Sequence, residues 1–175
     1  MPTLADTIVR REPIWSKLPY QPAFLSALYL PGLDRHIATG RILDTEMPSS
    51  NGMVTARGLA AMYAALANGG GFGGRVLLSP QRAHMLRDVQ TATRDRVSLG
   101  AKMRWRLGYH QASGTPSPGA FGHDGIGGST AWADQDSGLS FALVWNDVGD
   151  RAGVALRVAR GVKISRLAHK LAQGS

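Results

Sequence analysis

Apolar residues recur at three- and four-residue spacing in two stretches of the chain, and this spacing predicts an amphipathic helix in each. The first stretch follows Thr55, a good N-cap residue, and is stopped by Asn68-Gly69-Gly70. The second runs from about 153 to 172, with Val and Leu on one side and Arg and Lys on most of the rest. We expect the apolar side of this last helix to lie on a sheet.

A shorter helix and a run of strands are predicted between these two helices. Ser79-Pro80 combines an N-cap with proline at the first helical position, which predicts a helix through about Val89. The polar link Gln135-Asp136-Ser137-Gly138 between two apolar runs is typical of a hairpin. The segments expected to be extended are 75–78, 104–109, 120–123, 129–134 and 139–145.

The order of these elements is helix, helix, antiparallel strands, helix. It predicts an α+β fold, with an antiparallel β-sheet and flanking helices. Six of the nine prolines lie in the first 48 residues, and proline at this density favours loops and short turns. We therefore expect an irregular, proline-rich connecting segment at 1–47, followed by the main folded part at 48–175.

Composition narrows the classes of function. The 175 residues are 43% hydrophobic and 18% charged, which is typical of a globular protein, and the absence of cysteine excludes disulfides and thiol nucleophiles. The net charge of +8 raises the prospect of a polyanionic partner, but the excess Arg is dispersed, so solvated surface charge is favoured and nucleic acid is not expected. With no apolar run of membrane-spanning length and no visible signal peptide, the default expectation is a cytoplasmic protein.

Metal and cofactor sites are not expected either. The glycine run at 69–74 is not followed by Lys-Ser or Lys-Thr, so a phosphate-binding P-loop is not predicted. His84, His110 and His123 lack the spacing of metal ligands, and each is expected to be a surface or hydrogen-bonded residue.

The stretch Phe-Gly-His-Asp-Gly-Ile-Gly-Gly-Ser at 121–129 is the exception. Glycines on both sides of one histidine, between two strands, would let a ligand approach the backbone closely. The same residues also describe an ordinary glycine-rich turn that carries an exposed histidine. From the residues alone, the ordinary turn is the favoured interpretation.

This stretch and several others, in their order along the chain, resemble the β-lactamase-related serine hydrolases. That group includes class C β-lactamases, D-alanyl-D-alanine peptidases and esterases of the same fold. The resemblance extends over roughly 48–147 and implies part of a β-lactamase/transpeptidase-like fold. The other segments that carry it are 48–60, 66–70, 77–80, 105–109 and 133–139.

The resemblance also implies roles for the residues of the glycine-rich stretch. The family's third motif, Lys-Thr-Gly or His-x-Gly on an edge strand, corresponds to His123-Asp124-Gly125. By this match, His123 orients the substrate and assists proton transfer, Gly125 keeps the strand bare, and the backbone N–H of Ile126 is an oxyanion-hole donor. The residues then expected to contact the substrate are Asp124, Gly127, Gly128 and Ser129.

The family's nucleophile motif, Ser-x-x-Lys, does not occur in the sequence. The nearest approach is Ser79 followed by Arg82, whose guanidinium cannot act as a base at neutral pH. The second motif, Tyr-x-Asn or Tyr-x-Ser, is absent as well. We therefore expect a carboxy-terminal fragment of an esterase-like serine hydrolase that is inactive alone and acts on a small ester or amide only when completed by a missing half.

Two other functions remain open at this point. The chain could be a catalytically dead remnant that serves as an interaction module, since a partial fold leaves apolar surface for an upstream fragment or a second copy of the chain. It could also be a basic domain that binds a polyanion through its C-terminal Arg/Lys helix.

Overall fold

The structure, a computed structural model, describes residues 27, 39–49, 51–98, 100–125, 127–146 and 151–174. The chain divides into two compact units, Met1–Val54 with Arg94–Ala101 and Thr55–Thr93 with Lys102–Ser175. In the first unit a short 3-10 helix, η1 (Arg41–Asp44), is described. Most of the predicted proline-rich segment at 1–47 lies outside the described residues. The second unit contains the sheet and the candidate site.

Helix α5 (Ala56–Ala67) confirms the first predicted helix. The Thr55 hydroxyl accepts a hydrogen bond from the Gly58 N–H at 3.1 Å, which is the expected N-cap interaction. At the other end Gly69 and Gly70 have φ values of 71° and 94°, a left-handed conformation that ends the helix.

Helix α6 (Pro80–Met85) begins where predicted, with the Ser79 hydroxyl accepting from the Arg82 N–H at 3.4 Å. It ends sooner than Val89, because the amides that follow bond three residues back in tight turns. Before it, β1 (Gly71–Phe72) and β2 (Arg75–Val76) form a small antiparallel pair.

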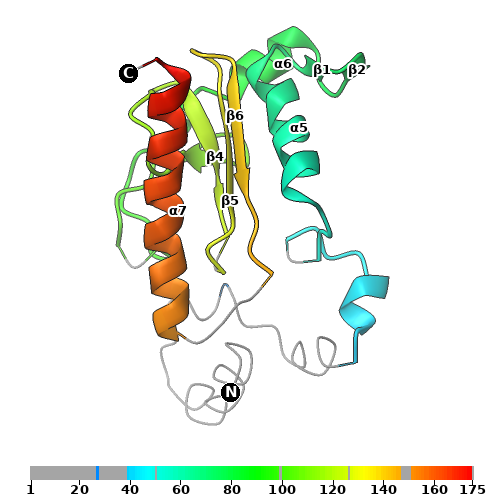
Figure 1. Cartoon of the computed structure of the whole chain (residues 1–175), viewed down its shortest axis with the longest axis vertical. Coiled ribbons are helices and arrows are strands. Elements are labelled where there is room, and N and C mark those ends of the chain that lie inside the picture. Colours follow the sequence, from blue (N-terminus) through cyan, green and yellow to red (C-terminus); the bar gives the residue numbers. More distant parts are fainter. Residues whose placement is uncertain are drawn as a thin grey trace. The chain divides into compact units, whose positions relative to one another are not determined.

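The main sheet has four antiparallel strands in the order β3-β4-β5-β6. Its bounds are β3 (His110–Gln111), β4 (Ala120–Asp124), β5 (Thr130–Asp134) and β6 (Leu139–Leu143). The polar link at 135–138 joins β5 to β6 as predicted, with Gly138 at φ 71°. Helices α5 and α7 (Arg151–Ala172) cover opposite faces of the sheet (Figure 1), which confirms the α+β fold class.

The prediction of a strand at 104–109 was wrong. Trp105 forms only isolated bridges, and the chain then turns at Leu107 and Gly108, with the Arg106 N–H donating to the Tyr109 carbonyl at 2.7 Å. Gly108 has φ 79°, which an extended strand does not allow. Strand β3 is therefore only two residues long, and it pairs with β4 no further than Gly122.

Buried Arg106 explains why the chain bends there. It is 4% exposed, and its guanidinium donates to the carbonyls of Arg87 at 2.8 Å and Pro118 at 2.9 Å. A buried cation must be hydrogen bonded, so the chain folds around this group instead of continuing as a strand.

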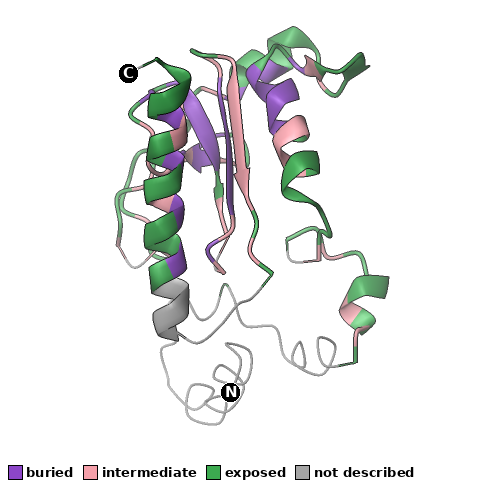
Figure 2. Cartoon of the chain, in the orientation of Figure 1, coloured by how far each residue is buried: buried purple, intermediate pink, exposed green. Residues whose placement is uncertain are grey.

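The two faces of the sheet pack differently. The face toward α5 is an apolar cluster, and the face toward α7 combines a smaller apolar cluster with buried polar atoms. Figure 2 shows buried residues on the strands of the sheet and on parts of α5 and α7. The first cluster consists of Tyr63, Leu66, Ala67, Leu86, Phe121, Ala131 and Ala133; the second consists of Ala112, Ala120 and Trp132.

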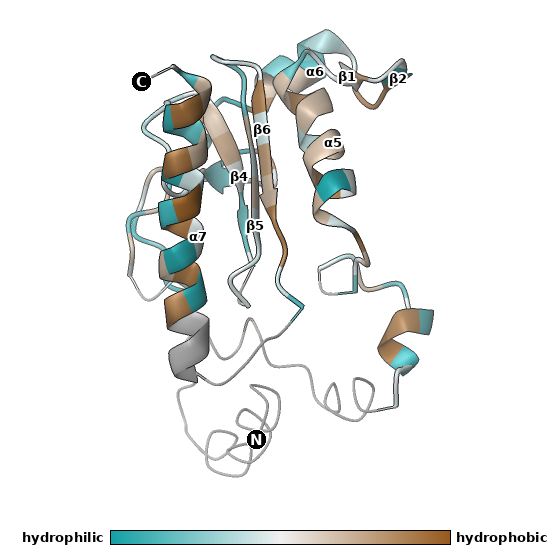
Figure 3. Ribbon diagram, in the orientation of Figure 1, coloured by the Kyte–Doolittle hydropathy of each residue, from teal (hydrophilic) through white to brown (hydrophobic). Residues whose placement is uncertain are grey.

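Helix α7 lays only part of its predicted apolar side toward the sheet, so that prediction was wrong in part. Val158 and Val162 line the small cavity between α7 and the sheet. The stripe of α7 that is buried has polar or small residues, whereas several of its Leu and Ile residues are exposed. Figure 3 shows hydrophobic and hydrophilic residues alternating along this helix. The buried residues are Arg157, Gly161, Ser165 and His169. The exposed residues are Leu156, Ile164, Leu167 and Leu171, of which Leu171 is 68% exposed.

Buried polar groups under α7 account for this orientation. The Trp132 indole N–H donates to the Ser165 hydroxyl at 2.7 Å, and His169 Nε2 lies 3.4 Å from the Asp134 carboxylate. A buried polar group without a partner costs more than an exposed leucine, so the helix turns its polar side inward.

Asp134 is the most connected of these groups. It is fully buried, and its carboxylate accepts from the hydroxyls of Ser117 and Ser137, each at 2.7 Å, and from the Asp136 N–H at 3.1 Å. Burial alone would raise the pKa of Asp134, but these hydrogen bonds and His169 outweigh it, so the pKa lies below its ordinary value of 3.8.

We predict that Asp134→Ala lowers the free energy of unfolding by about 3 kcal/mol, because it leaves several buried donors without an acceptor. Since the folded pKa is lowered, the contribution of this carboxylate is present above pH 3.8 and is lost as the pH falls through the folded pKa. The variant should therefore lose less stability than the parent chain in that acidic range.

Urea unfolding at neutral and acidic pH measures both effects. Asp88→Ala, at an exposed carboxylate, is the control, with an expected change within about 0.5 kcal/mol. Equal losses in the two variants would contradict the role assigned to Asp134.

Candidate functional site

The candidate site lies at the end of β4, around His123. Side chains alternate along this strand, so Phe121 and His123 face α5 while Gly122 and Asp124 face α7. His123 pairs with Ala131 of β5 on one side, and on the other side β3 stops at Gly122. The exposed His123 side chain therefore stands on a stretch of sheet edge that β3 leaves open.

The imidazole of His123 is near a second histidine. The ring centroids of His123 and His110 are 5.2 Å apart, with an angle of 51° between the planes. Partial burial and then the neighbouring His110 lower the pKa of His123 below 6.5, although Asp124 acts in the opposite direction. A neutral imidazole at physiological pH can accept a proton, which is the property that a general base requires.

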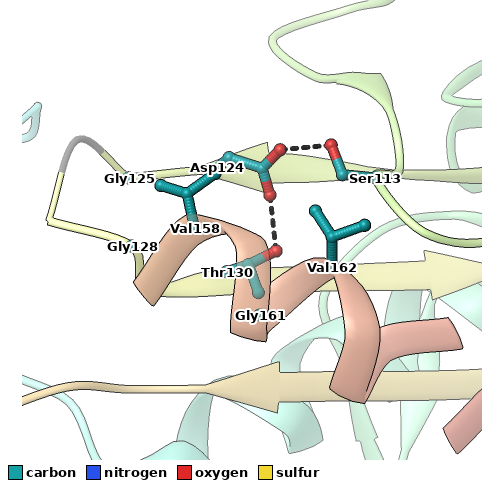
Figure 4. Close-up of a pocket in the computed structure, with 8 residues that line it drawn as sticks. All are labelled: Ser113, Asp124, Gly125, Gly128, Thr130, Val158, Gly161 and Val162. Atoms are coloured by element: carbon teal, nitrogen blue, oxygen red, sulfur yellow. Dashed lines mark hydrogen bonds between the residues drawn. The ribbon is translucent and has the colours of Figure 1, made fainter. Parts of the chain in front are cut away.

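Asp124 lies on the opposite face from His123. Its carboxylate accepts hydrogen bonds from the hydroxyls of Ser113 at 2.5 Å and Thr130 at 2.6 Å (Figure 4). This cluster borders a cavity of about 10 Å³ under α7, only about the size of one water molecule. The backbone of Asp124 belongs to the edge of β4 beyond the end of β3. The Asp124 side chain, however, is held on the face toward α7, away from the His123 ring.

The glycine-rich loop after β4 is tightly closed. The Gly125 N–H donates to the Ser129 carbonyl at 2.7 Å, and the Gly128 N–H donates to the Gly125 carbonyl at 2.9 Å. The loop is also attached to its surroundings: the Ser129 hydroxyl accepts from the Trp145 N–H at 3.1 Å. The described residues of this loop are therefore bonded to one another and to Trp145 at the end of the strand that carries His123.

Two further contacts bind the loop to neighbouring elements. The Gly128 carbonyl accepts from the Trp145 indole N–H at 3.1 Å, and the Gly127 carbonyl accepts from Arg157 Nε of α7 at 3.2 Å. Ile126, the predicted oxyanion-hole donor, lies outside the described residues, so its role stays a prediction.

The structure thus places the predicted residues in two groups. His123 lies on β4 beyond the end of β3, and Gly125 follows the strand. The Asp124 side chain, Gly127, Gly128 and the Ser129 hydroxyl are instead bonded to other residues, namely Ser113, Thr130, Trp145 and Arg157. Among the described residues, no hydroxyl is hydrogen bonded to His123. The arrangement can orient a substrate and exchange a proton with it, and a nucleophile would have to come from elsewhere.

His110, Ser113 and Thr130 were missed as site residues. His110 is 6% exposed, and its ring nitrogens bond to the Gln111 carbonyl and the Asp124 N–H. No spacing rule links it to His123, because the two meet only through the pairing of β3 with β4.

The other predicted features can be compared only over the described residues. No group of three His, Asp or Glu side chains there is placed to hold a metal ion. No helix in that part of the chain combines the length and apolarity needed to cross a bilayer.

Comparison with known proteins adds independent information. Residues 3–163 match the family model described as Beta-lactamase. The chain is 42% identical over 123 residues to the esterase/beta-lactamase LipL of Mycobacterium tuberculosis, a match that covers 69% of this chain and 28% of LipL.

Two crystal structures are similar in fold, each with a TM-score of 0.61 and 31% sequence identity. One is a family VIII carboxylesterase, with 81% of this chain and 39% of that chain covered. The other is a penicillin-binding protein homolog from Caulobacter crescentus, with 85% and 41% covered. The chain therefore spans less than half the length of each of these relatives.

We predict that Gly128→Ala destabilises the protein by about 1–3 kcal/mol. Gly128 has φ 91°, and a Cβ there would lie 2.8 Å from Arg157 Cβ of α7. Gly127→Ala is the matched control, because a Cβ at 127 meets no described atom within 4 Å and the change should stay within about 0.5 kcal/mol. Thermal unfolding of both variants tests this, and equal stability of the two would contradict the close packing of α7 on the loop.

We also predict that His123 titrates below pH 6.5 in the folded chain, because its ring is partly shielded from water and faces His110. Asp124→Asn should lower the pKa of His123 further, since it removes a negative charge that favours the imidazolium. Following the ring proton shifts by NMR against pH measures both values. A midpoint at or above 6.5 in the parent chain would contradict the environment described for His123.

Proposed function

Because the chain belongs to the beta-lactamase family of serine hydrolases, we propose that it forms the histidine wall of an acyl-transfer site in an esterase-type hydrolase. The observation that carries this proposal is the position of His123, exposed on the part of β4 that β3 leaves unpaired. The residues after His123 are glycine-rich, so little side-chain bulk keeps an ester or amide from approaching this end of the strand. The likeness to LipL and to a family VIII carboxylesterase supports the ester as substrate class.

In this proposal His123 acts on the reacting group through its neutral imidazole. A group of lowered pKa is free to take a proton at neutral pH and to return it to the leaving group. Gly125 beside it keeps side-chain bulk away from the substrate, and the backbone N–H of Ile126 would stabilise the oxyanion.

The reactive hydroxyl is proposed to come from sequence outside these 175 residues. No serine in the chain has lysine three residues later, and the chain spans only 28% of LipL. A histidine wall lowers the barrier only when a nucleophile attacks the substrate that it holds. The chain by itself is therefore proposed to be inactive toward esters and amides.

An interaction module is the second candidate function, and the exposed apolar residues of α7 favour it. Leu156, Leu167 and Leu171 are at least half exposed on the outward side of that helix. Such a surface is typical of a protein contact. In this second proposal the partner is an upstream fragment of the hydrolase fold or another copy of the chain.

We predict that a chimera in which this chain replaces the segment of LipL that it matches hydrolyses a p-nitrophenyl ester. His123→Ala in the chimera should lower kcat/KM about 100-fold, because it removes the group that exchanges a proton with the substrate. The isolated 175-residue chain should show no hydrolysis above buffer and no labelling by a fluorophosphonate probe.

His84→Ala is the matched control, since His84 is an exposed histidine of α6 and should leave kcat/KM unchanged within about twofold. A folded, active chimera that is indifferent to His123→Ala would refute the role of the histidine. Ester turnover by the isolated chain that requires His123 would refute its inactivity.

A further inference from the structure

We propose that His110 is a positioning residue for His123. It acts through its Nε2, which accepts a hydrogen bond from the N–H of the peptide that joins His123 to Asp124. The Asp124 N–H donates to His110 Nε2 at 3.2 Å. The inference deepens the proposed function above and rests on it for its catalytic meaning.

The early end of β3 creates the need for this contact. In an antiparallel pair every second residue directs its N–H and C=O toward the same neighbour, so the Asp124 N–H points to the same side as Gly122. His110 of β3 is the residue opposite Gly122. The chain before His110 turns away at Leu107 and Gly108, so no backbone of β3 lies opposite Asp124. The His110 side chain thus supplies the acceptor that a longer strand would have supplied from its backbone.

The direction of this bond fixes the proton of the His110 ring. A backbone N–H can only donate, so Nε2 of His110 must accept and carries no proton. The proton is then on Nδ1, which lies 2.8 Å from the Gln111 carbonyl and donates to it. In this geometry both ring nitrogens of His110 are bonded, Nε2 as an acceptor and Nδ1 as a donor.

Three contacts of His110 converge on the orientation of His123. The bond to the Asp124 N–H fixes the peptide plane that follows His123, and therefore the backbone from which its side chain projects. The His110 ring also contacts the His123 ring directly, at 5.2 Å between centroids. Trp105 packs edge-on against His110 at 5.5 Å and 88°, which holds the His110 ring in place.

The first test uses the parent chain and needs no substitution. Long-range proton–nitrogen NMR of the folded 175-residue chain should show a protonated Nδ1 and an unprotonated Nε2 for His110 at neutral pH. A protonated Nε2 would overturn the proposal, because that nitrogen could not accept the Asp124 N–H.

The second test uses a pair of variants. His110→Gln keeps an acceptor close to the position of Nε2, whereas His110→Phe keeps a ring and removes the acceptor. Amide hydrogen exchange at Asp124 should be about tenfold faster in His110→Phe than in the parent chain and within about threefold of it in His110→Gln.

Exchange at Leu66 in the buried part of α5 serves as the internal control. Faster exchange at both Asp124 and Leu66 reports global destabilisation. The comparison with His110→Gln and the tautomer measurement then decide whether His110 Nε2 accepts the Asp124 N–H. Unchanged Asp124 exchange in folded His110→Phe would overturn the proposal.

The catalytic consequence is read in the LipL chimera. His110→Phe should lower kcat about tenfold or more with KM changed less than threefold, because misplacing a catalytic group slows the reaction step. His110→Gln should restore most of kcat. Equal kcat in the two variants would overturn the positioning role, whereas a chimera with no activity at all contradicts only the proposed function, since the exchange and tautomer measurements do not depend on turnover.

Discussion

Buried polar groups between the sheet and α7 are the constraint from which much of the described structure follows. The indole N–H of Trp132 and the carboxylate of Asp134 both point away from α5, and each needs a partner where water is excluded. Helix α7 supplies Ser165 and His169 on one stripe. A helix that turns polar groups inward must turn other residues outward, and here those residues include Leu167 and Leu171.

The same principle acts at the edge that carries His123. Strand β3 ends early because the chain bends around buried Arg106, and the N–H of Asp124 is then satisfied by a side chain. The part of β4 beyond the end of β3 is therefore well ordered by hydrogen bonds. Its backbone is bonded, its glycine loop is closed by Ser129, and the His123 ring projects from a fixed position.

The sequence predicted the fold class because its local signals are strong. Thr55 and Ser79 are N-caps with side-chain hydrogen bonds, and the polar link after Asp134 is a hairpin turn. It failed at the segment 104–109 because the alternating pattern of polar and apolar residues ignores the left-handed Gly108. It failed in part for α7, because the hydrophobicity of one helix says nothing about the polar atoms on the face of the sheet that the helix covers.

For the site, the sequence could single out the glycine-flanked His123, since that cluster is local. It could not reveal His110, which comes from a separate strand, or the bonds from Ser113 and Thr130 that hold the Asp124 side chain on the other face. Contacts of this kind depend on strand register, and register is set by packing over the whole sheet.

The turn at Leu107 and Gly108 has a consequence for how this site can diverge. It acts as a stop that sets how far β3 runs along β4. Two more paired residues would place a backbone opposite His123 and Asp124 without altering either of them. The extent of pairing along the strand that carries the histidine is thus coupled to a glycine more than a dozen positions upstream, so sequence change in that turn can alter this sheet edge while every residue of 121–129 stays the same.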